Sequence, residues 1–163
     1  MLAGKTVALV LILVRGRPWE FQYDTGRCIY DEVRHCLMGY EWMRAHGMDP
    51  FQSPQYLHVF KWRSQFPPPV MQYCLLTMGN EVHAFPYRHR RVEAHQKFGG
   101  QLSEQFVRYD IADETQHVRF NNRWLPELLK LVGEKRPLKQ YTADVIKVWK
   151  EEYRTGKLPI NVE

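Results

Sequence analysis

The sequence of 163 residues predicts an all-α protein built from long helices. Three observations indicate this fold class. Apolar residues recur at steps of three and four through three long segments, as they do on the buried face of a helix. Most prolines and glycines fall between these segments, where they end helices. No stretch alternates convincingly between apolar and polar side chains over five or more residues, as a half-buried strand would.

Composition and charge narrow the class of protein. With 44% hydrophobic and 25% charged residues, the chain is expected to form one globular domain over residues 1–163. The formal charge of +5 comes mostly from scattered Lys and Arg residues, so nucleic acid is not the expected partner. Cys28, Cys36 and Cys74 show no C-x-x-C spacing, which indicates neither a disulfide framework nor a zinc knuckle and favours the reducing cytoplasm.

The first expected element is the end of a buried helix in GKTVALVLILVRG, residues 4–16. Its apolar run is much shorter than the ~20 residues that span a bilayer, so no membrane segment is predicted. Pro18 then suits the first turn of a long helix over residues 19–46. A break at 46–54 follows, and a short connecting helix is expected at 55–66.

A second long helix is expected over residues 70–97. Pro86 should kink or split it, because proline removes a backbone donor and clashes with the preceding turn. Gly99 and Gly100 form a plausible C-terminal stop.

The third long helix is expected over residues 101–133, with Asp110, Glu114 and His117 on its core face. Pro126 should kink this helix or open a new turn that ends at Gly133. The C-terminal region, 134–163, should contain a short helix at about 140–154 and an extended tail.

One five-residue pattern occurs twice in the chain. Asp31-Glu32-x-x-His35 lies in the first long helix, and Asp113-Glu114-x-x-His117 lies in the third. An Ile stands two places before each Asp, and a Trp stands seven places after each His. The motifs are 82 positions apart (114 − 32), about the length of two long helices with their connections. A duplicated helical hairpin explains this repeat economically.

The chemistry of each motif points to a metal ion. Positions i and i+3 share one face of a helix, so Glu-x-x-His directs a carboxylate and an imidazole toward one point. These ligands suit iron, manganese or zinc better than calcium or copper(I). The preceding Asp can accept the free ring N–H of the His on the opposite helix, which orients the imidazole. We therefore expect Asp31 to pair with His117 and Asp113 to pair with His35.

These motifs resemble those of the ferritin-like di-metal carboxylate proteins, and more narrowly an uncharacterised ferritin-like branch with D-E-x-x-H helices. The likeness covers residues 19–133 and implies an antiparallel four-helix bundle. The helix between the motifs should supply a bridging carboxylate, for which Glu81 is the better placed candidate and Glu93, beyond Pro86, the weaker one. The resemblance implies five metal ligands, with Asp31 and Asp113 behind the histidines: Glu32, His35, Glu81, Glu114 and His117.

The chain departs from the family pattern at its N-terminus. By the repeat, the partner of Glu81 would fall near position −1 (81 − 82). Either the first helix is incomplete, leaving residues 4–16 as its C-terminal half, or the protein binds metal with five ligands. We favour an incomplete first helix, because the apolar run looks like the end of a buried helix. The groove left open in that case would favour a homodimer or aggregation.

The resemblance implies one or two iron or manganese ions and an oxidoreductase that activates dioxygen or peroxide for a small-molecule substrate. One alternative is a metal-free helical scaffold in which Glu and His satisfy each other in a buried network. Another is a tRNA-modifying di-iron hydroxylase that holds RNA with the basic segment 87–91. The cluster Arg88–Arg91 is more typical of a solvated face, and Trp42 and Trp124 are expected in the core.

Overall fold

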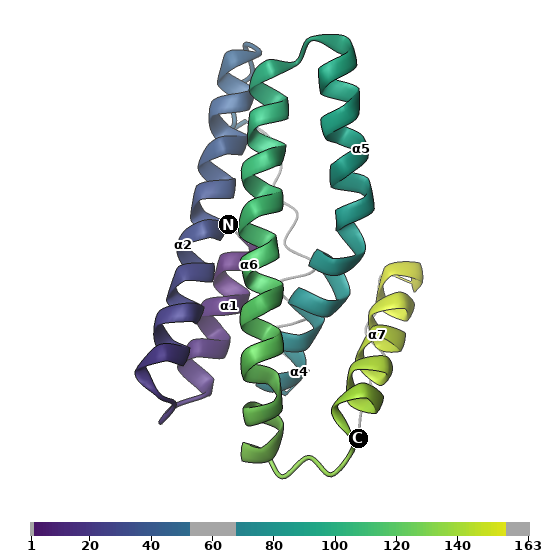
Figure 1. Ribbon diagram of the computed structural model, residues 1–163. Helices are drawn as coiled ribbons and strands as arrows, with labels where there is room; N and C mark the ends of the chain where they lie inside the picture. Colours follow the sequence, from purple (N-terminus) through teal and green to yellow (C-terminus); the bar gives the residue numbers. More distant parts are fainter. Residues whose placement is uncertain (1, 53–67, 156–163) are drawn as a thin grey trace.

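Every regular element in the described part of the chain is a helix, which confirms the all-α prediction. The computed structural model describes residues 2–52 and 68–155. None of its helices combines the length and the apolar character needed to cross a membrane. In chain order the elements are α1 (Leu2–Leu13), α2 (Trp19–Ala45), α4 (Pro69–Cys74), the π-helix η1 (Leu75–Glu81), α5 (Val82–Phe98), α6 (Gln101–Leu131) and α7 (Leu138–Thr155) (Figure 1).

The apolar run near the N-terminus forms α1, which packs against α2 and α4. Val7 and Val10 are buried on its inner face, and Val14 is buried just after its end, in agreement with the expected buried helix. With 12 residues α1 is about 18 Å long, whereas α2, with 27 residues, is about 40 Å long. It therefore accompanies only one half of α2 (Figure 1).

The long helices agree with the sequence predictions closely. α2 follows Pro18 and ends one residue before the predicted boundary, and the predicted connecting helix at 55–66 lies outside the described residues. α6 continues through Pro126 to Leu131 instead of opening a new turn. The carbonyl that would have received the missing proline N–H belongs to Asn122, which is exposed, so water can supply the hydrogen bond.

The segment around Pro86 differs from the prediction. α5 runs through Pro86 without splitting, and the regular α-helical hydrogen bonding changes earlier, at the π-helix η1. Proline crowds the turn before it rather than the residue itself, so an irregularity on its N-terminal side is physically reasonable. Glu81, the proposed bridging carboxylate, is the last residue of η1. Short π-helical segments occur frequently at functional sites.

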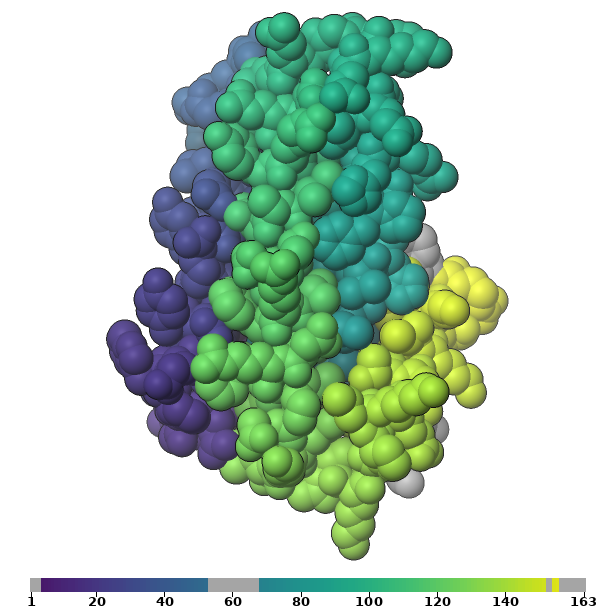
Figure 2. Space-filling view, viewed as in Figure 1, coloured from purple at the N-terminus to yellow at the C-terminus, as the bar shows by residue number. Residues whose placement is uncertain are grey.

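Three segments run side by side and enclose the middle of the molecule: α2, α6 and the continuous α4–η1–α5 segment (Figure 1). α5 and α6 form an antiparallel hairpin whose turn contains Gly99, at a φ of 80° that favours glycine. The side chains of α6 fill the face between α2 and α5 (Figure 2). α7 packs against η1, where Gly79 leaves room for the indole of Trp149.

Apolar side chains form the main core away from the motif residues. Phe21 stacks edge-on against Trp124, with ring centroids 5.6 Å apart, and both are buried. The Trp124 indole Nε1 donates to Asp24 Oδ2 at 2.7 Å. Trp124 therefore lies in the core as predicted, while Trp42 is only partly buried and donates to Ser103 Oγ at 2.7 Å.

Candidate metal centre

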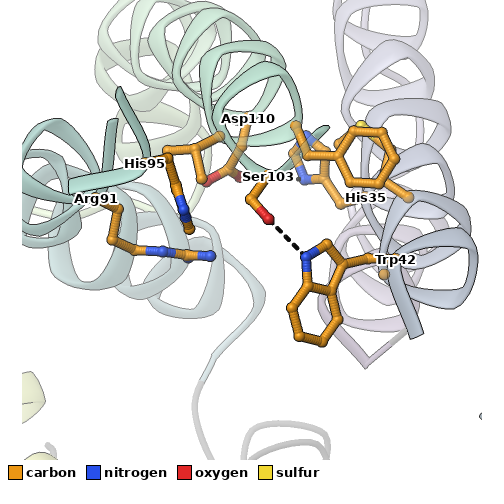
Figure 3. A pocket seen from close by; sticks show the side chains of 10 residues that line it. His35, Trp42, Arg91, His95, Ser103 and Asp110 are labelled. Atoms are coloured by element: carbon orange, nitrogen blue, oxygen red, sulfur yellow. Dashed lines mark hydrogen bonds and ion pairs between the residues drawn. The ribbon is translucent and has the colours of Figure 1, made fainter. Parts of the chain in front are cut away.

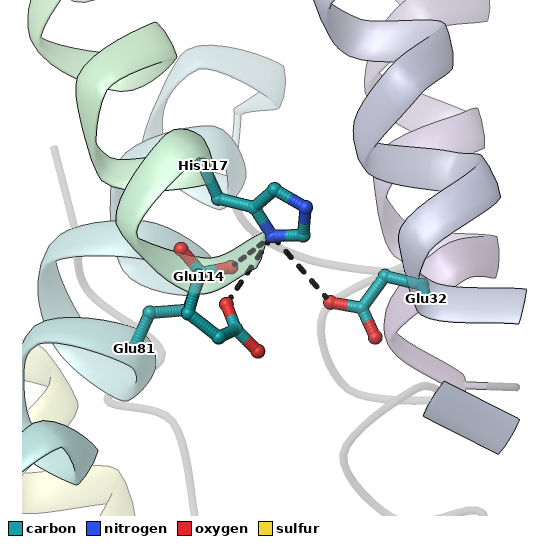
Figure 4. Close-up of side chains that lie close together, drawn as sticks. All are labelled: Glu32, Glu81, Glu114 and His117. Atoms are coloured by element: carbon teal, nitrogen blue, oxygen red, sulfur yellow. Dashed lines mark hydrogen bonds and ion pairs between the residues drawn. The ribbon is translucent and has the colours of Figure 1, made fainter. Parts of the chain in front are cut away.

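Four buried charged side chains from three elements meet in the middle of the molecule (Figure 4). Glu32 comes from α2, Glu81 from the end of η1, and Glu114 and His117 from α6. Each offers one ligand atom, and all four atoms lie within 4.8 Å of one another. Two ligands bound to one ion at about 2.1 Å are separated by no more than about 4.2 Å, so a small adjustment would bring these atoms onto a common ion.

The imidazole of His117 faces the three carboxylates with Nδ1 (Figure 4). This atom lies 3.2 Å from Glu114 Oε2, 3.4 Å from Glu81 Oε1 and 4.0 Å from Glu32 Oε1. Glu114 and His117 are neighbours on one face because they stand three positions apart on α6. The second motif thus directs both of its side chains into the cluster.

A second group forms around His35 on α2 and includes a residue that the motifs do not contain. His35, Asp110 and Glu114 also offer ligand atoms within 4.8 Å of one another. His35 Nδ1 lies 3.6 Å from Asp110 Oδ1, 3.8 Å from Glu32 Oε2 and 3.9 Å from Glu114 Oε1. Glu32 and Glu114 therefore lie between the two histidines, whose ring centroids are 6.4 Å apart.

The other nitrogen of each imidazole faces the aspartate of the opposite motif. His35 Nε2 lies 3.0 Å from Asp113 Oδ2, and His117 Nε2 lies 3.4 Å from Asp31 Oδ2. Both contacts cross between the motifs as expected, but only the contact of His35 is a hydrogen bond, because His117 Nε2 has no hydrogen-bond partner among the described residues. When Nε2 carries the proton and faces a carboxylate, the lone pair of Nδ1 points into the cluster and is free to bind a cation.

Arginines hold these aspartates in place. Arg27 Nε lies 2.9 and 3.0 Å from the two oxygens of Asp31. Arg34 Nη2 donates to Asp31 Oδ1 at 3.2 Å and also to Asp113 Oδ1. One guanidinium therefore contacts the aspartates of both motifs.

Arg88 is an exception to the predicted solvated face Arg88–Arg91, whose other three residues are exposed. Its side chain is 13% exposed and points toward α6 instead of solvent. Arg88 Nη2 donates to Glu114 Oε1 at 2.8 Å, Nε donates to Asp110 Oδ2, and Nη1 donates to the Glu81 carbonyl oxygen at 3.3 Å. The sequence signal was the seven-residue step from Glu81, which places both residues on one helix face. Asp110 was not predicted as a ligand. Its position four residues before Glu114, on the same face of α6, was the sequence signal.

The protonation of the cluster reflects burial and crowding. Burial raises the pKa of Glu81 to about 8, and the charges of Glu114 and Glu32 add to this effect while His117 opposes it. Burial lowers the pKa of His35, but hydrogen bonding and attraction to Glu32, Asp110 and Asp113 outweigh it and raise the pKa to about 9. Burial likewise opposes protonation of His117, yet its contacts with Cys28, Glu114 and Glu81 hold its pKa well above the ordinary value.

The hydrogen bonding of the cluster is incomplete within the described residues. Glu81 Oε2, Glu114 Oε2 and His117 Nε2 are buried and have no hydrogen-bond partner there, although His117 Nδ1 makes an ion-pair contact with Glu114 Oε2 at 3.2 Å. Buried carboxylate oxygens normally have a donor or a cation beside them. With His35 and His117 neutral and the carboxyl groups ionised, as metal binding requires, six carboxylates in and around the cluster face three guanidinium groups: Asp31, Glu32, Glu81, Asp110, Asp113 and Glu114 against Arg27, Arg34 and Arg88. The residues present therefore fit a divalent cation in both charge and donor type.

The structure also places the weaker bridging candidate, the first helix and a carboxylate outside the motifs. Glu93, the weaker candidate for the bridging carboxylate, is exposed on α5 and belongs to neither group. α1 contains no Asp or Glu, and its Gly4 lies against Glu32, where an added Cβ would come within 3.2 Å of the Glu32 Cβ. Asp110 is the carboxylate that stands beside His35 in addition to the two shared glutamates.

No protein-family model, no curated protein and no solved structure matches the chain.

Proposed function

We propose that the chain is a ferritin-like metalloprotein that binds one or two iron or manganese ions at the buried cluster. The four legs of the bundle would be α1, α2, the α4–η1–α5 segment and α6. The observation that carries the proposal is the meeting of Glu32, Glu81, Glu114 and His117 within 4.8 Å, with two carboxylate oxygens that lack hydrogen-bond partners among the described residues.

The donor set and the family resemblance together support iron or manganese. Carboxylate oxygens outnumber imidazole nitrogens, and no cysteine belongs to either group within the described residues. This mixture suits iron, manganese or zinc, whereas thiolates would favour copper(I) and oxygen donors alone would favour calcium or magnesium. The resemblance to the di-metal carboxylate proteins is our reason for preferring iron or manganese to zinc. We assign one position to His117 with Glu81 and the other to His35 with Asp110. Glu32 and Glu114 lie between the two positions.

The residues of the chain would prepare this site in three ways. Asp31 and Asp113 face Nε2 of the opposite histidines and would favour a proton on that nitrogen, so that Nδ1 would face the ions. Arg88 binds Glu114 and Asp110 and restrains their orientation. Bound iron or manganese would supply dioxygen or peroxide activation, which makes an oxidoreductase the function class that we favour.

The metal-free scaffold is the second candidate, and specific contacts favour it. A protonated His117 with Glu81 and Glu114, together with Arg88 on Glu114, would satisfy part of the network without metal. The tRNA-modifying hydroxylase has less support, because Arg88 of the basic segment is engaged by Asp110 and Glu114.

Elemental analysis of protein produced with iron and manganese in the medium tests the proposal. We expect between about half and two equivalents of metal per chain, and His117→Ala and His35→Ala should each lose most of it, because the remaining buried carboxylates lose a ligand partner. His89→Ala, at an exposed position on α5, is the matched control and should keep its metal. Wild-type protein without metal, or wild-type metal content in both variants, would exclude this site.

A further inference from the structure

A pocket of about 330 Å³ opens between α2, α5 and α6 beside the second ligand group (Figure 3). His35 and Asp110, the two residues specific to that group, form part of its wall. The pocket lies along α2 on the C-terminal side of Glu32, whereas α1 contacts α2 beside Glu32 at Gly4. Its volume falls in the range of small-molecule binding sites, which begins at about 300 Å³.

The wall of this pocket has an apolar part and a basic part. Met38, Trp42, Phe106 and Val107 supply the apolar part. On the α5 side, Arg91 and His95 lie opposite Trp42 (Figure 3). A ligand that fits must therefore combine an apolar body with a group that accepts hydrogen bonds from basic side chains.

The charges on the wall favour an anion. Arg91 makes no ion pair with any residue in the described part of the chain, and its guanidinium lies 5.8 Å from the Tyr87 ring centroid. Asp110 is the acidic residue of the wall, and Arg88 already binds it. A free guanidinium can form a bidentate, charge-assisted pair with a carboxylate.

The glycine at position 39 leaves the pocket wall without a side chain at that point. It lies inside α2, where glycine is less favourable than alanine. A Cβ added at Gly39 would meet no atom within 4 Å, and the residue lines the pocket.

We propose that this pocket binds a small organic acid whose carboxylate pairs with Arg91, beside His95, and whose apolar chain packs along Met38 and Phe106 toward His35. The ligand would then end beside the second position of the metal centre. Its role as the substrate of that centre rests on the proposed function, whereas its binding does not require the metal.

Calorimetric titration with octanoate and with its neutral analogue octanamide tests the proposal. The two probes share their apolar chain, so the difference in affinity isolates the charge. Because the pair between the octanoate carboxylate and Arg91 is charge-assisted, octanoate should bind the wild type about tenfold more tightly than octanamide does. Equal affinities, or no binding of either probe, would overturn the assignment.

Two matched pairs of variants locate the binding site. Arg91→Gln should reduce octanoate binding about tenfold or more and leave octanamide binding unchanged, while Arg90→Gln, at the adjacent exposed position, should have no effect. Gly39→Leu should abolish binding of both probes by filling the pocket. Gly26→Leu is its control, because Gly26 also lies in α2 with no atom within 4 Å of an added Cβ but does not line the pocket. Octanoate binding that survives both Arg91→Gln and Gly39→Leu would place the site elsewhere and refute the proposal.

Metal analysis of the same samples separates this proposal from the proposed function. Titrations are carried out on protein as purified and on protein treated with a chelator. If metal is bound but octanoate is not, the pocket assignment fails and the metal centre stands. If octanoate binds with the expected variant pattern in protein that never holds metal, the pocket stands and the proposed metal centre fails.

Discussion

Replacing Glu81 by Gln should stabilise the metal-free protein, although it removes a proposed metal ligand. Glu81 is 3% exposed, and burial beside Glu114 and Glu32 raises its pKa from 4.5 to about 8. At neutral pH the unfolded chain holds this carboxyl ionised, while the folded chain holds it largely protonated. The raised pKa therefore opposes folding above the unfolded value of 4.5, and the effect grows until the pH passes about 8.

The size of the effect follows from about 1.36 kcal/mol for each tenfold change in proton affinity. At about pH 7.5 the penalty comes to roughly 4 kcal/mol, and at about pH 5 it falls below roughly 1 kcal/mol. Since Gln has nearly the same shape and no charge, metal-free Glu81→Gln should exceed the wild type in unfolding free energy by about 2–4 kcal/mol at about pH 7.5. Most of this gain should disappear at about pH 5.

Urea unfolding in the presence of a chelator measures the difference in unfolding free energy between Glu81→Gln and the wild type. Glu93→Gln, at an exposed position on α5, is the control. With saturating metal the order should reverse, because the wild type gains stability from ion binding that the variant has weakened. A metal-free Glu81→Gln protein that is less stable than the wild type at about pH 7.5 would refute the reasoning. It would mean that Glu81 is an ionised partner of His117 in a self-sufficient network.

Three further predictions follow from contacts around the site. Asp113→Asn should weaken metal affinity by roughly 10–100-fold in equilibrium dialysis, with an unchanged circular dichroism spectrum, because it alters the partner of His35 Nε2; unchanged affinity would contradict that role. Asp110→Asn should remove one of two metal equivalents and leave the other, and loss of both or of neither would contradict the two-position assignment. Gly79→Ala should lower the unfolding free energy by about 1–3 kcal/mol, because the new Cβ would lie 2.7 Å from the Trp149 ring, and unaltered stability would show that α7 shifts freely.

The helices and the meeting of the two motifs could be predicted because both depend on local periodicity. The steps of three and four gave α2 and α6 with ends within about two residues of those observed. The i, i+3 spacing placed Glu and His of each motif on one face, and the repeat then indicated that the two faces meet. The repeat also indicated that Asp31 and Asp113 would lie beside the opposite histidines, because each precedes its Glu by one position.

Other features depend on the tertiary environment and were missed. Arg88 stands in a basic segment that is typical of a solvated surface. It turns inward because the carboxylates of Asp110 and Glu114 face it from α6. The π-helix η1 has no sequence pattern of its own. Pro86 led to the prediction of a break at residue 86, whereas the irregular hydrogen bonding lies at residues 75–81. Trp42 was assigned to the core, but it borders a pocket that no local pattern reveals.

Arg34 has no equivalent in the sequence repeat, since the corresponding position (34 + 82) is the exposed Gln116. The two histidines therefore sit in different surroundings: His117 is 1% exposed and His35 is 14% exposed at the side chain. Among the arginines in the described part of the chain, Arg34 is the one that pairs with Asp113, whereas Asp31 pairs with both Arg34 and Arg27. If each histidine receives an ion, the two binding steps should have unequal affinities, and a half-loaded form should accumulate during titration instead of a simple mixture of empty and full protein.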